Sequence, residues 1–142
     1  MNHVREFLKE MGGDYTFIGN QYHLKVGTKD LYIDLLLFHR RLRSLIAIEL
    51  KIGEFEAEYA GKMQLYLTVL DEQIKLPDEN PSIGIIICKS KDKTFVEYAL
   101  KRSNVPIGVA TYQLSSSLPE NMRELLPTPE EIVRRLKIFE EE

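Results

Sequence analysis

Three charged residues stand where the chain is otherwise apolar. Asp34 lies inside the apolar segment 31–38, and Glu49 and Lys51 lie in the segment 45–51. Residues two apart on a β-strand point to the same face, so Glu49 and Lys51 should share one face of a strand. Charges among apolar residues are costly to bury unless they are paired or bind a metal. These three side chains are therefore the first candidates for chemistry.

A hairpin would bring the three residues together. If the two segments pair as antiparallel strands with Asp34 opposite Glu49, the turn is centred between Arg41 and Leu42, where the sequence becomes polar and basic. Opposed residues share a face, with Cβ atoms about 4.5–5.5 Å apart. The register that the chemistry needs is therefore also the register that the turn favours.

Two adjacent carboxylates repel each other and favour a cation between them. Mg²⁺, or Mn²⁺ in its place, prefers oxygen ligands and keeps several waters, and the backbone carbonyl of Leu50 is a possible third ligand. Lys51 would then position or help deprotonate a water and stabilise charge that develops on a phosphate. On spacing alone, a buried salt bridge between Asp34 and Lys51 without a metal explains the pattern equally well.

The rest of the chain predicts a single domain over residues 1–142, with elements in the order α-β-β-β-α-β-α-β-α. The strands are expected at residues 15–26, 31–38, 45–51, 82–88 and 107–112. The helices are expected before Gly12, at 54–73, at 91–101, and in a tail over residues 115–142. An antiparallel beginning joined to a parallel end gives an α/β fold, a mixed sheet flanked by helices. In the helix at 91–101, Phe95, Tyr98 and Ala99 should face inward.

Composition limits the class of protein. The chain is 44% hydrophobic and 29% charged, which is ordinary for a globular domain, and its one cysteine, Cys88, excludes an internal disulfide. No apolar stretch approaches the roughly 20 residues that span a bilayer, and the charged start is unlike a signal peptide. We therefore expect a cytoplasmic protein without membrane contact. A net charge of −3 argues against strong nonspecific DNA binding by this domain alone.

Several stretches of the chain resemble a known protein family. The stretch YIDLLLFHRRLRSLIAIELKIGEFEAEYAGKMQLYL resembles the PD-(D/E)XK nuclease domain of YhcG-type bacterial proteins, and ENPSIGIIICK, VEYAL and PIGVATYQL continue the match. The resemblance implies a restriction-endonuclease-like fold with Asp34, Glu49 and Lys51 in the family's acid, acid and lysine roles. It also implies a supporting glutamine on the next helix, for which Gln64 is the candidate. Ile33 stands where the superfamily's name has proline.

The function that the resemblance implies is that of a Mg²⁺-dependent nuclease, an endodeoxyribonuclease that hydrolyses phosphodiester bonds of DNA. Relatives usually carry an additional N-terminal domain, which is expected to be absent here. Relatives also use a first-helix glutamate as an extra ligand, which makes Glu6 and Glu10 candidates. Two alternatives remain open: a module that recognises DNA structure without cleaving it, and a module that mainly forms a homodimer.

Basic residues outside the cluster are candidates for contact with DNA phosphates. Arg40, Arg41 and Arg43 lie in the expected turn after the second strand, and Lys89 and Lys91 lie beyond the fourth strand. Lys62 lies on the expected helix at 54–73. The turn, which also contains His39, lies about 17 Å from Asp34 along a strand, so it would reach flanking phosphates rather than the one that is cleaved. A solvated turn and loop explain these residues equally well. His23, on the first strand, is more readily explained as a structural or surface residue.

Overall fold

The computed structural model of the protein describes residues 14–111. Its strands are β1 (Tyr15–Val26), β2 (Lys29–His39), β3 (Ser44–Leu50), β4 (Ile83–Cys88) and β5 (Ile107–Thr111). Its helices are α2 (Ala57–Val69), which continues into one π-helical turn, η1 (Leu70–Ile74), and α3 (Lys93–Leu100). The predicted first helix with Glu6 and Glu10, and the predicted tail over residues 115–142, lie outside the described residues. Neither described α-helix is long and apolar enough to cross a membrane.

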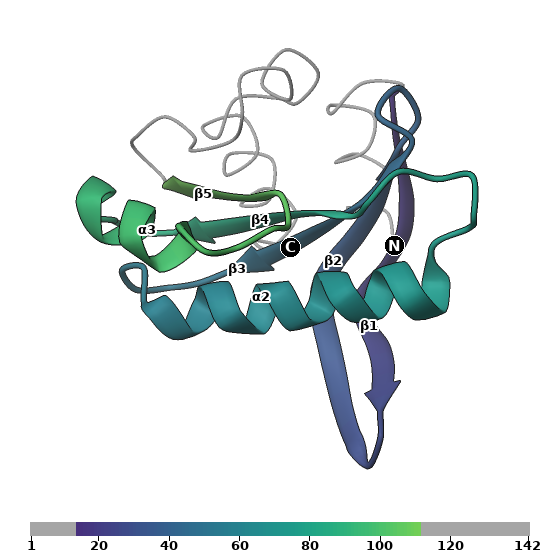
Figure 1. The fold of residues 1–142 in the computed structure, drawn as a ribbon, viewed down its shortest axis with the longest axis horizontal. Coiled ribbons are helices and arrows are strands. Elements are labelled where there is room, and N and C mark those ends of the chain that lie inside the picture. The colour runs from purple at the N-terminus through teal and green to yellow at the C-terminus, as the bar shows by residue number, and fades with distance from the viewer. Residues whose placement is uncertain (1–13, 112–142) are drawn as a thin grey trace, which may run out of the picture.

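The strands form one mixed sheet in the order β1-β2-β3-β4-β5 (Figure 1). The pairs β1–β2 and β2–β3 are antiparallel, whereas β3–β4 and β4–β5 are parallel. This arrangement confirms the predicted fold class. The β1–β2 hairpin turns through Gly27, whose φ of 61° lies in the left-handed region that glycine adopts without strain. The far end of this hairpin projects beyond α2 (Figure 1).

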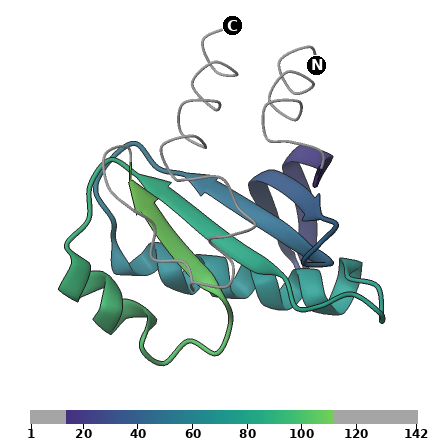
Figure 2. The ribbon, with the colours of Figure 1, turned by 90° about the horizontal axis from the view of Figure 1, so that it is seen from above.

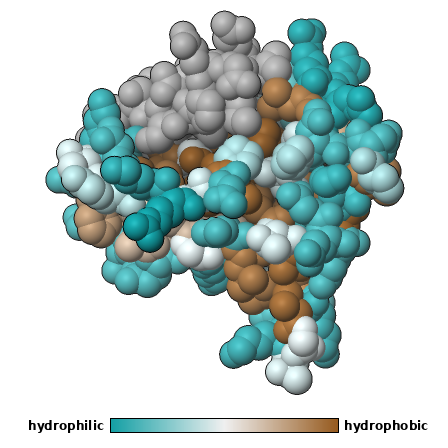
Figure 3. Space-filling model, viewed as in Figure 1, coloured by the Kyte–Doolittle hydropathy of each residue, from teal (hydrophilic) through white to brown (hydrophobic). Residues whose placement is uncertain are grey.

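Helix α2 lies along one face of the sheet (Figure 2). Met63 and Leu67 of α2 belong to one buried cluster with Ala47 of β3 and Ile86 of β4. A second buried cluster occupies the other face and consists of Tyr15, Leu35, Leu37, Ile46, Ile48, Ile83, Ile85 and Ile87. Burial on both faces explains why the central strands are continuously apolar. On the face that Figure 3 shows, hydrophobic side chains gather where α2 crosses the β1–β2 hairpin.

The predicted packing of α3 is wrong for Phe95 and Tyr98 and confirmed for Ala99, which packs against the core. Phe95 is 49% exposed and Tyr98 is 71% exposed, whereas Val96 is buried. The helix is shorter than predicted because it begins after Asp92, whose side-chain oxygen accepts a hydrogen bond from the Phe95 N–H and caps the helix. Two turns of helix can bury only a narrow stripe, and Val96 with the half-buried Ala99 and Leu100 forms it.

A close approach between β4 and α2 gives the first prediction. A Cβ atom added at Gly84 would lie 2.6 Å from Cγ and 2.7 Å from Sδ of Met63, so Gly84→Ala should lower the free energy of unfolding by about 1–3 kcal/mol. Urea unfolding measures this loss, which should shrink in a Met63→Ala background. The control is Gly61→Ala, because a Cβ there meets nothing within 4 Å and an alanine suits a helix better than glycine. Equal losses at the two glycines would contradict the packing.

Candidate active site

The β2–β3 hairpin has the predicted register. Leu35 faces Ile48 and His39 faces Ser44, which places Asp34 and Glu49 at the same level just beyond the last paired residues. Each of the two carboxylates also bonds to the backbone of the other strand. Oε2 of Glu49 accepts a hydrogen bond of 2.7 Å from the Asp34 N–H, and Oδ2 of Asp34 accepts one of 3.0 Å from the Leu50 N–H. These reciprocal bonds hold both acids in place.

Two further side chains reach this pair. Nε2 of Gln21, on β1, donates a hydrogen bond of 3.0 Å to Oδ1 of Asp34. Nζ of Lys51 lies 3.9 Å from Oε1 of Glu49 and 4.8 Å from the centre of the Tyr59 ring. The lysine predicted from sequence therefore lies beside the predicted acids, between a carboxylate and an aromatic face.

The side chains of this cluster line a cavity of about 290 Å³. Its walls come from β1, β2, the end of β3, and α2. The residues that line it are Gln21, Asp30, Leu31, Tyr32, Asp34, Glu49, Lys51, Lys62 and Tyr66. Lys62 and Tyr66 are four apart on α2 and so share a helix face. The cavity thus places two lysines near the two central carboxylates, a combination suited to a phosphate and a cation.

Burial makes one of the acids difficult to ionise. Glu49 is only 5% exposed, and loss of hydration raises its pKa to about 7. The hydrogen bond from the Asp34 N–H and the charges of Lys51 and Lys62 lower this pKa, while the charge of Asp34 raises it. The pKa of the neighbouring Tyr66 is also raised, to about 12. Burial is the main cause, and the charges of Glu49 and Asp34 add to it. Loss of hydration is thus the main reason that Glu49 resists ionisation, and a cation bound to its carboxylate would favour the ionised form.

The donor set fits a hard divalent cation that keeps part of its water shell. Asp34 and Glu49 offer carboxylate oxygens from opposite strands, and Leu50 is at the same strand end. Within residues 14–111, no three Asp, Glu, His or Cys residues gather as a metal-binding group. Mg²⁺ does not need a full protein cage, since one or two carboxylates with waters are its usual protein ligands.

Gln64 is not brought to this cavity. It lies on α2, and its side chain is exposed. Residues two apart on a helix do not face each other, and Gln64 is two residues from both Lys62 and Tyr66, which do line the cavity. The glutamine whose side chain contacts Asp34 is Gln21.

The predicted basic turn is engaged with acidic residues. Arg40 and Arg41 lie 3.4 and 3.1 Å from Oδ1 of Asp14, and Nη2 of Arg43 lies 3.3 Å from Oδ2 of Asp78. The two arginines beside Asp14 lower the pKa of that carboxyl group. The three arginine side chains are more than half exposed, so they are partly neutralised but remain accessible.

The two lysines beyond β4 differ from each other. Lys89 is exposed, whereas Lys91 is half-buried and its Nζ donates a hydrogen bond of 2.9 Å to the carbonyl of Val109. Neither lines the cavity around Glu49. The structure therefore gives Lys91 a part in holding β5, and a role of Lys89 in binding phosphate stays a prediction.

Gln21 could have been found from the sequence. Facing residues of an antiparallel pair have a constant index sum, and the turn at Gly27 fixes that sum for β1 and β2. The observed pairs Asn20–Leu35 and Tyr22–Ile33 show that Gln21 lies opposite Asp34. Its φ of 48° could not have been expected, because a glutamine rarely adopts the left-handed region.

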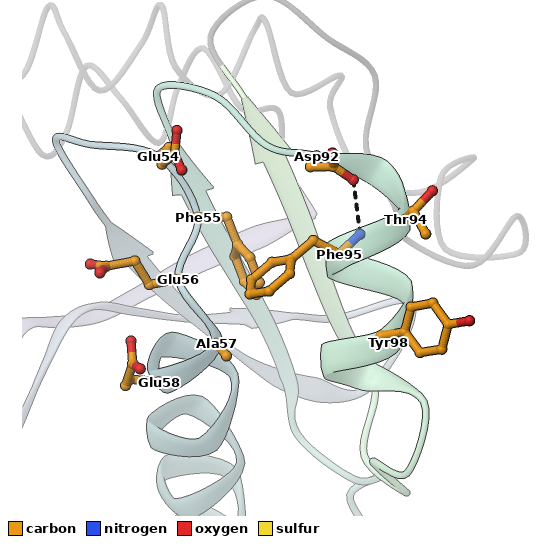
Figure 4. A pocket seen from close by; sticks show the side chains of 9 residues that line it. All are labelled: Glu54, Phe55, Glu56, Ala57, Glu58, Asp92, Thr94, Phe95 and Tyr98. Atoms are coloured by element: carbon orange, nitrogen blue, oxygen red, sulfur yellow. Dashed lines mark hydrogen bonds between the residues drawn. The ribbon is translucent and has the colours of Figure 1, made fainter.

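A larger cavity, of about 660 Å³, lies where the beginnings of α2 and α3 meet (Figure 4). Its lining residues are Glu54, Phe55, Glu56, Ala57, Glu58, Asp92, Thr94, Phe95 and Tyr98. This lining contains four acids and neither lysine nor arginine, so it would repel a phosphate. We therefore assign phosphate chemistry to the smaller cavity.

Comparison with known proteins places the chain in a family. It is 38% identical to YhcG of Escherichia coli (strain K12) over 141 residues, which cover 99% of this chain and 36% of that protein. In fold it is similar to the EndoMS–dsDNA2 complex (TM-score 0.48, 14% identity, 78% of this chain and 43% of that one). It is also similar to a repair endonuclease from Pyrococcus abyssi (TM-score 0.49, 13% identity, 80% of this chain and 44% of that one). The family model of the YhcG PDDEXK nuclease domain matches residues 1–127. This chain therefore belongs to the YhcG PDDEXK nuclease domain family.

Proposed function

We propose that this nuclease domain hydrolyses phosphodiester bonds of DNA, within the strand, and that it needs a divalent cation, Mg²⁺ in the first place. One observation carries the proposal: Asp34, Glu49 and Lys51 converge on a single cavity whose other wall supplies Lys62. Membership of a nuclease family supports the reaction class. The choice of DNA over RNA rests on the family resemblance, and a cytoplasmic location belongs to the same proposal.

Each residue of the cluster has a separate role in this proposal. Asp34 and Glu49 would hold the cation, which when bound would promote attack of water and offset charge on the phosphate. Lys51, which lies between Glu49 and Tyr59, would position the attacking water and stabilise charge on the phosphate. Lys62 enters the cavity from α2 and adds a second positive charge for the phosphate.

Gln21 has a supporting role. Its hydrogen bond holds the Asp34 carboxylate in the orientation in which the other carboxylate oxygen accepts from the Leu50 N–H on β3. Gln64, for which the family resemblance implies a supporting role on the helix, does not line the cavity. A donor that hydrogen-bonds to a metal-binding carboxylate in this way keeps the carboxylate in one rotamer.

Affinity for DNA should be modest. The arginines of the turn are shared with Asp14 and Asp78, and the net charge is −3. Few phosphates can therefore be neutralised, and the salt-dependent term that dominates nonspecific binding is small. The chain spans 36% of the length of YhcG from Escherichia coli. We propose that regions beyond this domain, or a second copy in a homodimer, add affinity.

Metal titration tests the site. Calorimetry with Mn²⁺ and Mg²⁺ should give binding to the parent chain that is lost in Asp34→Ala and in Glu49→Ala, because each acid supplies part of a small ligand set. Glu97→Ala is the control, since Glu97 is an exposed glutamate on α3. If Asp34→Ala or Glu49→Ala binds the metal as tightly as the parent does, the residue that was replaced is not a ligand.

Cleavage tests the reaction. Supercoiled, linear and branched DNA, with RNA of matched sequence, are incubated with the parent chain and with Glu49→Ala. We expect metal-dependent nicking of DNA by the parent alone. If the parent binds metal and DNA but leaves every substrate intact, the domain recognises DNA without cleaving it. Equal cleavage by both proteins would reject the site.

A further inference from the structure

Tyr32, which lines the candidate active site, forms an aromatic pair with His23. Tyr32 of β2 is two residues before Asp34 and faces His23 of β1. The two rings are stacked, with centroids 5.0 Å apart and planes 27° apart. Nε2 of His23 lies 2.7 Å from Oδ1 of Asp30, a hydrogen-bond distance that fixes the orientation of the imidazole. The pair is therefore a preformed aromatic surface at the site.

The fold does not use this surface for packing. Tyr32 is 50% exposed and the His23 side chain 48% exposed, whereas Leu24 and Ile33, their neighbours in sequence, are buried in the core. Successive residues of a strand point to opposite sides, so Tyr32 points away from the side on which Ile33 is buried. Tyr32 lines that cavity together with Asp34 and Glu49.

The surface continues outward to a cation. His23 and Lys25 are two apart on β1 and share a face, and Lys25 is exposed opposite Asp30. From the acids outward, this side of the hairpin therefore presents the carboxylate of Asp34, then the aromatic stack, and then the facing pair of Lys25 and Asp30. Tyr32 lies about 7 Å from Asp34 along the strand, at roughly 3.3 Å per residue. A nucleotide whose base contacts Tyr32 thus has its phosphates close to the acids.

We propose that the Tyr32–His23 pair is a stacking platform for an unpaired nucleobase next to the phosphate that is cleaved. The inference rests on the proposed nuclease function and narrows its substrate class. Every base has a π-face that can stack on an aromatic ring, but inside a duplex the neighbouring bases cover both faces. The platform therefore selects single strands, or duplexes with an unpaired nucleotide beside the cleavage site, over continuous duplex DNA.

Binding without metal tests the platform separately from catalysis. Fluorescence anisotropy in EDTA measures the affinity of the 142-residue chain for a labelled 12-nucleotide oligothymidine and for a labelled 12-base-pair duplex. In Tyr32→Ala the affinity for the single strand should fall by about tenfold, within the range measured for loss of one stacked base. The affinity for the duplex should change less than twofold. Tyr32→Phe keeps the ring and should bind the single strand as the parent does.

Two further variants complete the test. Tyr32→Leu keeps apolar bulk without a ring, so it should lose single-strand affinity as Tyr32→Ala does while unfolding at the parent's temperature. Tyr98→Ala removes another exposed tyrosine, which does not line the cavity around Asp34 and Glu49. This variant should leave both affinities unchanged. Unchanged single-strand affinity in Tyr32→Ala, or an equal loss for the duplex, would overturn the platform. The cleavage assay with Glu49→Ala decides the nuclease proposal independently, because it does not depend on Tyr32.

Discussion

Lys51→Ala is expected to slow DNA cleavage at least a hundredfold while the affinity for Mn²⁺ stays within a few-fold of the parent. The ammonium group of Lys51 lies 3.9 Å from the nearer Glu49 oxygen, so it is beside the ligands without being one of them. Removing one positioned charge from an active site typically costs about 10²–10³ in rate. Single-turnover cleavage of a labelled DNA, with calorimetry on the same preparation, measures both effects.

Lys51→Arg should be nearly as inactive as the alanine variant. A planar guanidinium cannot replace a compact ammonium where the group lies between a carboxylate and the Tyr59 ring. Lys62→Ala is the matched comparison, because Lys62 lines the same cavity from the exposed surface of α2. Its loss should weaken DNA binding more than it slows the chemical step. If Lys51→Ala cleaves at the rate of the parent, the lysine has no part in the mechanism.

The centre of the site could be predicted from sequence because two independent signals agreed. The index sum that places Asp34 opposite Glu49 also places the turn in the polar segment around Arg41, and the structure has this register. Local pattern was sufficient here because register in a hairpin is fixed by its turn and by the alternation of its strands. The mixed sheet followed in the same way from strand order and from the apolar run of β4.

Sequence could not determine which residues of α3 are buried or which acids the basic turn contacts. Phe95 and Tyr98 were wrongly predicted to face inward because the cap at Asp92 sets where the helix begins, and periodicity over two turns could not distinguish Phe95 from Val96 as the buried residue. Phosphate binding by the basic turn stays a prediction, but its ion pairs could not be foreseen because Asp14 and Asp78, the partners of its arginines, are far away in sequence.

Gln64 was chosen because it lies on the helix after the lysine, whereas the bond to Asp34 comes from Gln21 on a strand that precedes both acids. A helix of the correct length still presents only some of its residues to the sheet, and the starting residue of α2 decides which ones. Placement of a supporting residue thus requires the phase of an element, which sequence gives less precisely than its existence.

The metal-free protein should lose stability as pH rises from about 5 to 8, and Glu49→Gln should abolish that loss. Burial raises the pKa of Glu49 from 4.5 to about 7 in the folded state, so between these values the folded chain holds a proton that the unfolded chain has released. Its contribution is complete below pH 4.5 and is lost as pH rises through 7. At roughly 1.4 kcal/mol per pKa unit, the loss is about 3 kcal/mol.

Urea unfolding in EDTA at several pH values measures this loss, with Glu97→Gln as the control because Glu97 is exposed. Comparing the profiles of the two variants separates the contribution of Glu49 from those of all other titrating groups. Saturating Mg²⁺ should flatten the profile of the parent, because a cation stabilises the ionised carboxylate and binds the folded chain in preference to the unfolded one. Glu49→Gln should gain little from Mg²⁺ at any pH. If the parent and Glu49→Gln have parallel profiles in EDTA, Glu49 is already ionised in the folded protein, and the electrostatic case for a cation at this position fails.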